Sequence, residues 1–257
     1  MGRTRKFIKG IKKMKLTDAL AKSGISAIVY GEAGIGKTHF VGTLPGKTLL
    51  IAAEKNGINT LKKFPPEVQD RLELLFLPPI TANIEQTSAA YNKFFDDLMV
   101  NDHDQDNIVL DSATELANLL LILKTDPAKN GGIPTMKNYG EVQFCMKRYL
   151  RILRDIASIN GKNIIIIALE SELVINQTAD AAMTSKTHPA LSGKKLAPEA
   201  EGLFDIVAHL EKRSDGTRVF RLESNEQFVA KDRFGRAGSL ATGEALLYPV
   251  ENKKEEK

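Results

Sequence analysis

The sequence predicts an α/β fold in which a mostly parallel, twisted sheet is flanked by helices on both sides. Short apolar runs alternate with segments of helical period along most of the chain, as in parallel sheets with crossover helices. The run "NIIIIAL" is apolar on both of its faces, as a central parallel strand is. After about residue 205 the pattern changes to short strands separated by turns, which predicts a C-terminal antiparallel hairpin.

The expected strands and helices follow one another in a regular order. Apolar runs predict strands at 25–30, 47–54, 72–79, 107–112 and 163–169. Helical patterns between them predict helices that start near residue 37 and at 57–64, 83–100, 113–124 and 139–158. The last of these helices carries an apolar stripe that suits packing on the sheet: Val142, Cys145, Met146, Tyr149, Ile152, Leu153 and Ile156. The hairpin is expected from segments 204–211, 213–223 and 227–235, with "SDG" as a turn.

The two ends of the chain differ from the expected core over 23–240. Residues 1–22 form a basic leader, in which every charged residue before Asp18 is Lys or Arg. We interpret the leader as a solvated tail, with a docking arm for a neighbouring subunit or nucleic acid as the alternative. Residues 241–257 are expected to be a solvated tail.

Composition narrows the class of protein. A net charge of +4 permits a polyanionic partner without requiring one. The single Cys145 excludes an internal disulfide and a cysteine-rich zinc site, and four scattered His residues argue against a metal cluster. The longest apolar run is too short to span a bilayer, so we expect a cytoplasmic protein without a membrane partner.

The segment "GEAGIGKT" at 31–38 matches the phosphate-binding pattern G-x-x-x-x-G-K-[ST] between a strand and a helix. Its glycines let the backbone curl so that N–H groups point into one concavity that accepts phosphate oxygens. Lys37 is expected to reach the β and γ phosphates, and the Thr38 hydroxyl to ligate Mg²⁺. The alternative is a glycine turn before an ordinary helix. The expected ATP and Mg²⁺ site comprises Gly31, Glu32, Ala33, Gly34, Ile35, Gly36, Lys37, Thr38 and His39.

Two carboxylates at strand ends are candidates for the rest of the site. Asp111 closes the strand "NIVLD" and is expected to orient Mg²⁺ and its water. The acid cluster at 101–106 is the alternative, and we interpret it as a polar loop. Glu54 closes the strand that follows the phosphate loop, where it can polarise the attacking water, or it is a surface glutamate that begins a loop.

Together these segments resemble the RecA-like ATPase core. "GEAGIGKT", "LLIAAE" and "IVLDS" occur in the order that this family shows, and "AKDRFGRAG" is similar to its Lys-x-Arg element. With "YGEV", "IIIIALE" and "FDIVAHLE", the chain looks most like phage-encoded RecA-like ATPases of single-strand annealing and recombination, often labelled AAA-domain proteins. The resemblance covers roughly residues 25–238.

The resemblance implies roles for further residues. Glu54 would act as catalytic base beside Lys37, and Lys231 and Arg233 would reach the ATP of an adjacent subunit in a ring or filament. A basic edge strand that resists aggregation is the alternative for Lys231 and Arg233. Where the family commonly carries Gln or His after the strand at 163–169, this chain has Leu169 and Glu170, so the role of sensing the γ phosphate passes to Glu170 or is lost.

A long polar loop is expected at 170–197. By resemblance it would bind DNA, and a flexible surface loop is the alternative. Its candidate backbone-phosphate contacts are Lys186, His188, Lys194 and Lys195.

The resemblance therefore implies an ATP-hydrolysing protein that acts on single-stranded DNA in phage recombination, annealing or repair. Its expected partners are single-stranded DNA, further copies of the chain and a single-strand-binding protein. A helicase-like loader or translocase and a nucleotide-dependent interaction switch with little turnover are the alternatives. A small-molecule kinase is disfavoured, because no arginine-rich lid segment follows the strand that ends in Asp111.

Overall fold

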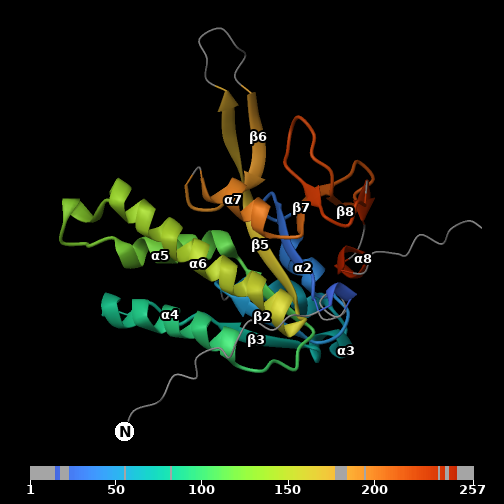
Figure 1. Ribbon diagram of the computed structural model, residues 1–257, viewed down its shortest axis with the longest axis horizontal. Coiled ribbons are helices and arrows are strands. Elements are labelled where there is room, and N and C mark those ends of the chain that lie inside the picture. Colours follow the sequence, from blue (N-terminus) through green and yellow to red (C-terminus); the bar gives the residue numbers. More distant parts are fainter. Residues whose placement is uncertain are drawn as a thin grey trace, which may run out of the picture.

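The computed structural model describes eight ranges of the chain, and Figure 1 shows their arrangement. The ranges are 15–17, 23–54, 56–81, 83–176, 184–193, 195–236, 238–240 and 243–247. Most of the leader expected at 1–22, most of the tail expected at 241–257, and Lys194 lie outside the described residues.

A twisted sheet with the strand order β10-β8-β7-β1-β5-β4-β2-β3 forms the middle of the fold. Neighbours from β7 to β3 are parallel, and β8, β9 and β10 add antiparallel pairs at the C-terminal side. The strands that follow this order are β10 (Ser239–Leu240), β8 (Arg218–Arg221), β7 (Ile206–Lys212), β1 (Ser26–Gly31), β5 (Asn163–Asn176), β4 (Asn107–Asp111), β2 (Thr48–Ala52) and β3 (Leu72–Phe76). Beside them, β6 (Thr184–Pro189) pairs with β5 and β9 (Lys231–Asp232) pairs with β7. The predicted mixed α/β fold with a C-terminal antiparallel hairpin is confirmed.

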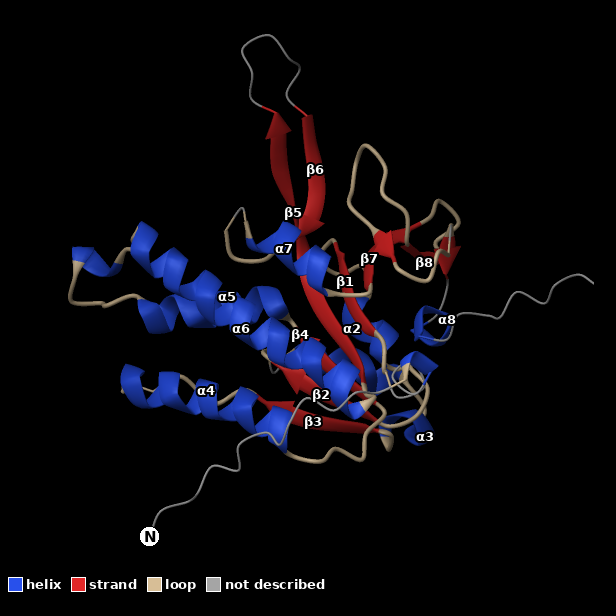
Figure 2. Ribbon diagram, viewed as in Figure 1, coloured by secondary structure: helices blue, strands red, loops and turns tan. Residues whose placement is uncertain are grey.

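Helices cover both faces of the sheet (Figure 2). One face carries α4 (Ile84–Val100), α5 (Ala113–Lys124), α6 (Met136–Asn160) and α7 (Leu196–Leu203). The other face carries α2 (Lys37–Val41), the 3-10 helix η1 (Gly57–Lys63) and α8 (Gly243–Leu247). Two short helices, α3 (Pro66–Gln69) and the 3-10 helix η2 (Asn130–Gly132), lie in connections. No helix within the described ranges combines the length and apolar character needed to cross a membrane.

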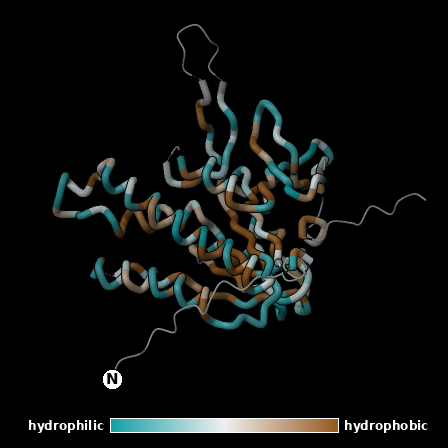
Figure 3. Tube along the Cα trace, viewed as in Figure 1, coloured by the Kyte–Doolittle hydropathy of each residue, from teal (hydrophilic) through white to brown (hydrophobic). Residues whose placement is uncertain are grey.

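The core divides into two layers because side chains alternate along each strand. On β1, Ile28 packs with the α4–α6 layer, whereas Ala27 and Val29 pack with the α2 layer. On β5, Ile164 and Ile166 face the first layer and Ile165 and Ile167 the second. These strand residues are fully buried, and Figure 3 shows the apolar chain concentrated at the sheet.

Most of the described residues in segment 170–197 are in strands or a helix, so the prediction of a long loop is wrong for them. Residues 177–183 and Lys194 of this segment lie outside the described ranges. β5 continues past Leu169 to Asn176 and pairs antiparallel with β6. The resulting ribbon projects from the body of the fold (Figure 1), and α7 follows it. The segment "ESELVIN" contains several polar residues, so it shows no apolar run that would predict a strand. Pairing within the ribbon depends on backbone hydrogen bonds rather than on burial in an apolar core.

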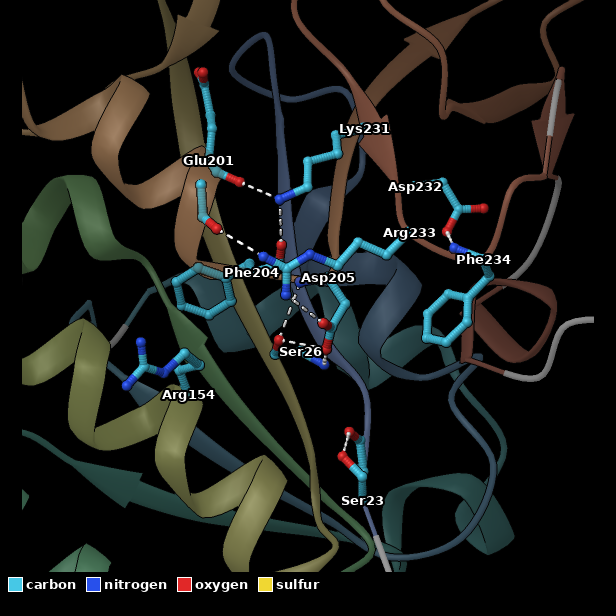
Figure 4. A network of polar contacts seen from close by, with 12 residues as sticks. Ser23, Ser26, Arg154, Glu201, Phe204, Asp205, Lys231, Asp232, Arg233 and Phe234 are labelled. Atoms are coloured by element: carbon cyan, nitrogen blue, oxygen red, sulfur yellow. Dashed lines mark hydrogen bonds and ion pairs between the residues drawn. The ribbon is translucent and has the colours of Figure 1, made fainter. Parts of the chain in front are cut away.

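Asp205 ties the start of β7 to the start of β1 (Figure 4). Its carboxylate accepts hydrogen bonds from Ser26 N at 3.1 Å and from Ser26 Oγ at 2.7 Å. Arg233 Nη1 donates to the same carboxylate at 2.9 Å. Since Ser26 is buried, its polar atoms depend on this partner.

We expect Asp205→Ala to lower the free energy of unfolding by about 1–3 kcal/mol, because the buried Ser26 N–H loses this acceptor. Urea denaturation measures the change. Asp104→Ala is the matched control: its ion pair with Lys47 is exposed on both sides, so we expect no measurable change. Equal stabilities of the Asp205 variant and the control would contradict the prediction.

Candidate nucleotide site

A cavity of about 380 Å³ lies at the carboxyl ends of β1, β4 and β2. It brings together Lys37 and Thr38 from the start of α2, Asp111 from the end of β4, and Glu54 from beyond β2. Its volume is in the range of small-molecule sites, about 300–1,000 Å³. Three segments that are distant in sequence therefore meet because their strands are parallel.

The loop between β1 and α2 has the backbone form that a phosphate cradle needs. Gly34 and Gly36 have φ values of 76° and 109°, in the region that disfavours residues with a side chain. These conformations reverse the direction of the peptide groups and can turn successive N–H groups toward one concavity. The glycines are thus required by the curvature of the loop.

Lys37 is held at this loop by backbone carbonyls. Its Nζ donates to Gly31 O at 2.8 Å and to Glu32 O at 2.6 Å, and the side chain is buried. Burial lowers the pKa of Lys37, and the carboxylates of Asp111, Glu170 and Glu32 act in the opposite direction. A phosphate chain in the cavity would offer this ammonium group stronger, charged acceptors than the two carbonyls.

Thr38 and Asp111 form the part of the site that suits a magnesium ion. Thr38 Oγ1 donates to Asp111 Oδ2 at 2.6 Å. Burial raises the pKa of Asp111, and the Thr38 hydrogen bond and the Lys37 charge oppose the rise. A hydroxyl and a carboxylate side by side are hard oxygen donors of the kind that Mg²⁺ takes together with substrate phosphates. The described residues hold no group of three or more His, Cys, Asp or Glu that could bind a metal without such help.

Glu54 lies two residues beyond β2, so the predicted strand ends earlier than expected, but its side chain lines the same cavity. Burial raises the pKa of this carboxyl group, and the nearby carboxylates of Glu115 and Asp111 raise it further. A carboxylate with a raised pKa is a stronger base toward water. The placement suits the predicted catalytic role.

Sequence reasoning missed the first two turns of α5, where Thr114, Glu115 and Asn118 line the cavity. Thr114 Oγ1 accepts from Leu169 N at 2.9 Å and donates to Ala190 O at 2.8 Å. It therefore joins the cavity wall to Leu169 on β5 and to Ala190, which directly follows β6, at the root of the ribbon. Their position in the sequence could have indicated this role, because they directly follow the strand that ends in Asp111.

The side chains of Leu169 and Glu170, at the end of the core part of β5, have different surroundings. Leu169 lines the nucleotide cavity. Glu170 is not among the lining residues: its Oε2 lies 3.0 Å from His209 Nε2 on β7. An apolar side chain thus occupies the place where the resembled family commonly carries Gln or His.

Lys231 and Arg233 are not among the residues that line the cavity. Lys231 Nζ donates to Glu201 O and Phe204 O, each at 2.8 Å, at the C-terminal end of α7. Arg233 donates to Gly202 O at 2.8 Å and to Asp205. Because β9 pairs with the first residues of β7, both cations lie at the amino edge of the sheet, away from the phosphate loop of their own chain.

The described candidates for DNA contacts differ in their exposure. His188 is buried, with Nδ1 at 2.6 Å from Glu201 Oε1, so it does not offer an exposed contact. Lys186 lies on β6 opposite Leu173, and Lys195 is exposed at the start of α7.

Comparison with known proteins agrees with this geometry. The family model described as the AAA domain matches residues 23–234, a range that includes the phosphate loop, Glu54 and Asp111. A comparison with curated proteins gave no match. Because the family match spans most of the sequence, the chain belongs to the AAA domain family of P-loop ATPases.

Proposed function

We propose that the chain is a magnesium-dependent ATPase that acts on single-stranded DNA in recombination, annealing or repair, as a ring or filament. The observation that carries the ATPase part is the convergence of Lys37, Thr38, Asp111 and Glu54 in one cavity. The DNA and assembly parts rest on the resemblance together with the features argued below.

Each residue of the cavity has a distinct task in this proposal. The loop N–H groups and Lys37 bind the β and γ phosphates, and Thr38 with Asp111 hold the metal ion. When bound, Mg²⁺ would neutralise charge on the phosphates. Glu54 accepts the proton of the attacking water, which makes the water a better nucleophile.

We expect Glu54→Gln to lower kcat for ATP by about 10²–10⁴-fold, because the amide cannot accept the proton. The Kd for MgATP should stay close to wild type, since Lys37 and the loop are intact. Phosphate release and calorimetric titration measure the two quantities. Glu67→Gln, at an exposed position of α3, is the matched control.

Unchanged turnover in the Glu54 variant would remove this residue from the mechanism. Negligible turnover of the wild-type chain, despite tight MgATP binding, would instead favour the nucleotide-dependent switch.

The β5–β6 ribbon supports the DNA part of the proposal. It projects from the fold, and its root is joined to the cavity wall through Thr114. A strand bound along the ribbon and α7 could therefore influence the geometry of the cavity. Lys186 and Lys195 would contact backbone phosphates, which accounts for binding without base recognition.

We expect single-stranded DNA to raise ATP turnover at low salt. A double variant with Lys186→Ala and Lys195→Ala should need more DNA for half-maximal stimulation, and its salt slope should fall by about 0.7 for each lost phosphate contact. Lys93→Ala with Lys129→Ala, on exposed ion pairs elsewhere, is the control. Turnover that saturating DNA does not change would reject the DNA role. Strand displacement with a defined polarity would favour the loader or translocase.

The position of Lys231 and Arg233 supports a head-to-tail assembly. A group that lies away from its own cavity can reach a neighbour's cavity when the same two surfaces repeat around a ring or filament. The Arg233 side chain is 49% exposed, although its guanidinium also holds Asp205. In trans, this group would leave Asp205 and stabilise charge on the γ phosphate.

We expect Arg233→Ala and Lys37→Ala each to abolish turnover, and mixtures of the two to recover part of it, because some sites then combine an intact Lys37 with a neighbour's intact Arg233. Turnover across mixing ratios measures the recovery. A mixture of Arg221→Ala with Lys37→Ala sets the reference, since Arg221 pairs with Glu211 on β7. The absence of recovery at every ratio would contradict action in trans.

A further inference from the structure

We propose that Arg218, supplied by the C-terminal hairpin, is a positioning residue of the nucleotide site that acts through the phosphate loop. This inference rests on the proposed ATP-binding function and adds a residue to it. The ligand concerned is the phosphate chain of the nucleotide.

The hairpin brings Arg218 to the correct end of the sheet. β7 runs parallel to β1, and β8 returns antiparallel to β7 with Arg218 opposite Lys212. Arg218 therefore lies at the carboxyl end of β7, the end at which β1 enters the phosphate loop. The turn before it is held by Asp215 Oδ1, which accepts from Thr217 N at 2.8 Å and from Thr217 Oγ1 at 2.6 Å.

Arg218 makes direct contact with the loop. Its Nε donates to Ile35 O at 2.5 Å. A Cβ placed on Gly36 would lie 2.8 Å from Arg218 Nε and 3.0 Å from its Cδ. The side chain thus lies flat across Gly36, which gives a second reason, besides its positive φ, for a glycine at this position.

The contact fixes the peptide groups that would bind phosphate. The carbonyl of Ile35 and the N–H of Gly36 belong to one rigid, planar peptide unit. A hydrogen bond that holds this carbonyl therefore also fixes the direction of the Gly36 N–H. A preorganised cradle binds its ligand more tightly, because less conformational entropy is lost on binding.

The positive charge of Arg218 also affects a residue that lines the cavity. Burial lowers the pKa of His39, and the Arg218 guanidinium is the next cause of that shift. His39 is itself a lining residue of the cavity. Among the described residues, Arg218 Nη1 and Nη2 have no hydrogen-bond partner, so the positive charge beside the loop is not neutralised by a carboxylate.

Arg218→Gln in the full chain tests the proposal. We expect the Kd values for MgATP and MgADP to rise together by about tenfold, equivalent to about 1.4 kcal/mol, because both nucleotides use the same loop. KM should rise with them while kcat stays near wild type, since Glu54 is untouched. Arg218→Lys, which keeps the charge but lacks the Nε–H, should lose at least about threefold in affinity.

Arg221→Gln is the control, because it removes a guanidinium from the same strand whose partner is Glu211 on β7 rather than the loop. A lower Tm shared by the Arg218 and Arg221 variants, with affinity lost only in the former, would support positioning rather than a general effect on the hairpin. Kd values of Arg218→Gln within about twofold of wild type would overturn the inference. If that variant does not fold, unchanged affinity of Arg218→Lys overturns it.

Failure of this inference differs from failure of the proposed function. Wild-type chain that does not bind MgATP would reject the function itself. If wild type binds, Lys37→Ala does not, and Arg218→Gln binds like wild type, only the role of Arg218 is rejected.

Discussion

The hydrogen bond from Thr38 to Asp111 is the contact that joins the two halves of the site. β5 lies between β1 and β4, and neighbouring strands are about 4.8 Å apart, so the ends of β1 and β4 are separated by about 10 Å. Thr38 crosses this gap from the start of α2 and ends 2.6 Å from the carboxylate. Lys37 precedes Thr38 in sequence, and Glu54 follows the strand beside β4. Lys37 and Glu54 are therefore both placed close in the chain or in the sheet to the elements that this hydrogen bond connects.

The charges of the cavity explain why it suits a metal-bound nucleotide. Glu54, Asp111 and Glu115 bring three carboxylates to a space that would also receive a polyphosphate. Lys37 supplies one positive charge against them, and burial disfavours the charged forms of Lys37, Asp111 and Glu54 alike. A divalent cation bound with the nucleotide would relieve this imbalance. In the proposed function, the acidic wall would therefore favour the magnesium complex over free ATP.

Much of the fold was predictable because its signals are local. The isoleucines of β5 and the apolar stripe of α6 show their period directly, and the phosphate loop is recognised by its spacing. Asp111 and Glu54 were predictable because parallel strands end at one edge of a sheet. The ribbon was not predictable, because its strands are polar and are stabilised by pairing with each other. Arg218 gave no signal either, since its contact with Ile35 depends on the register of a hairpin 183 residues further along the chain.

The continuity of β5 has a mechanical consequence. One strand of 14 residues, Asn163–Asn176, forms the centre of the sheet with its first part and one side of the projecting ribbon with its second. The base of the ribbon therefore lies between β1, which leads into the phosphate loop, and β4, which carries Asp111. No loop separates the sheet part of Asn163–Asn176 from its ribbon part, so a displacement of the ribbon would act directly on the strand between these two elements of the site.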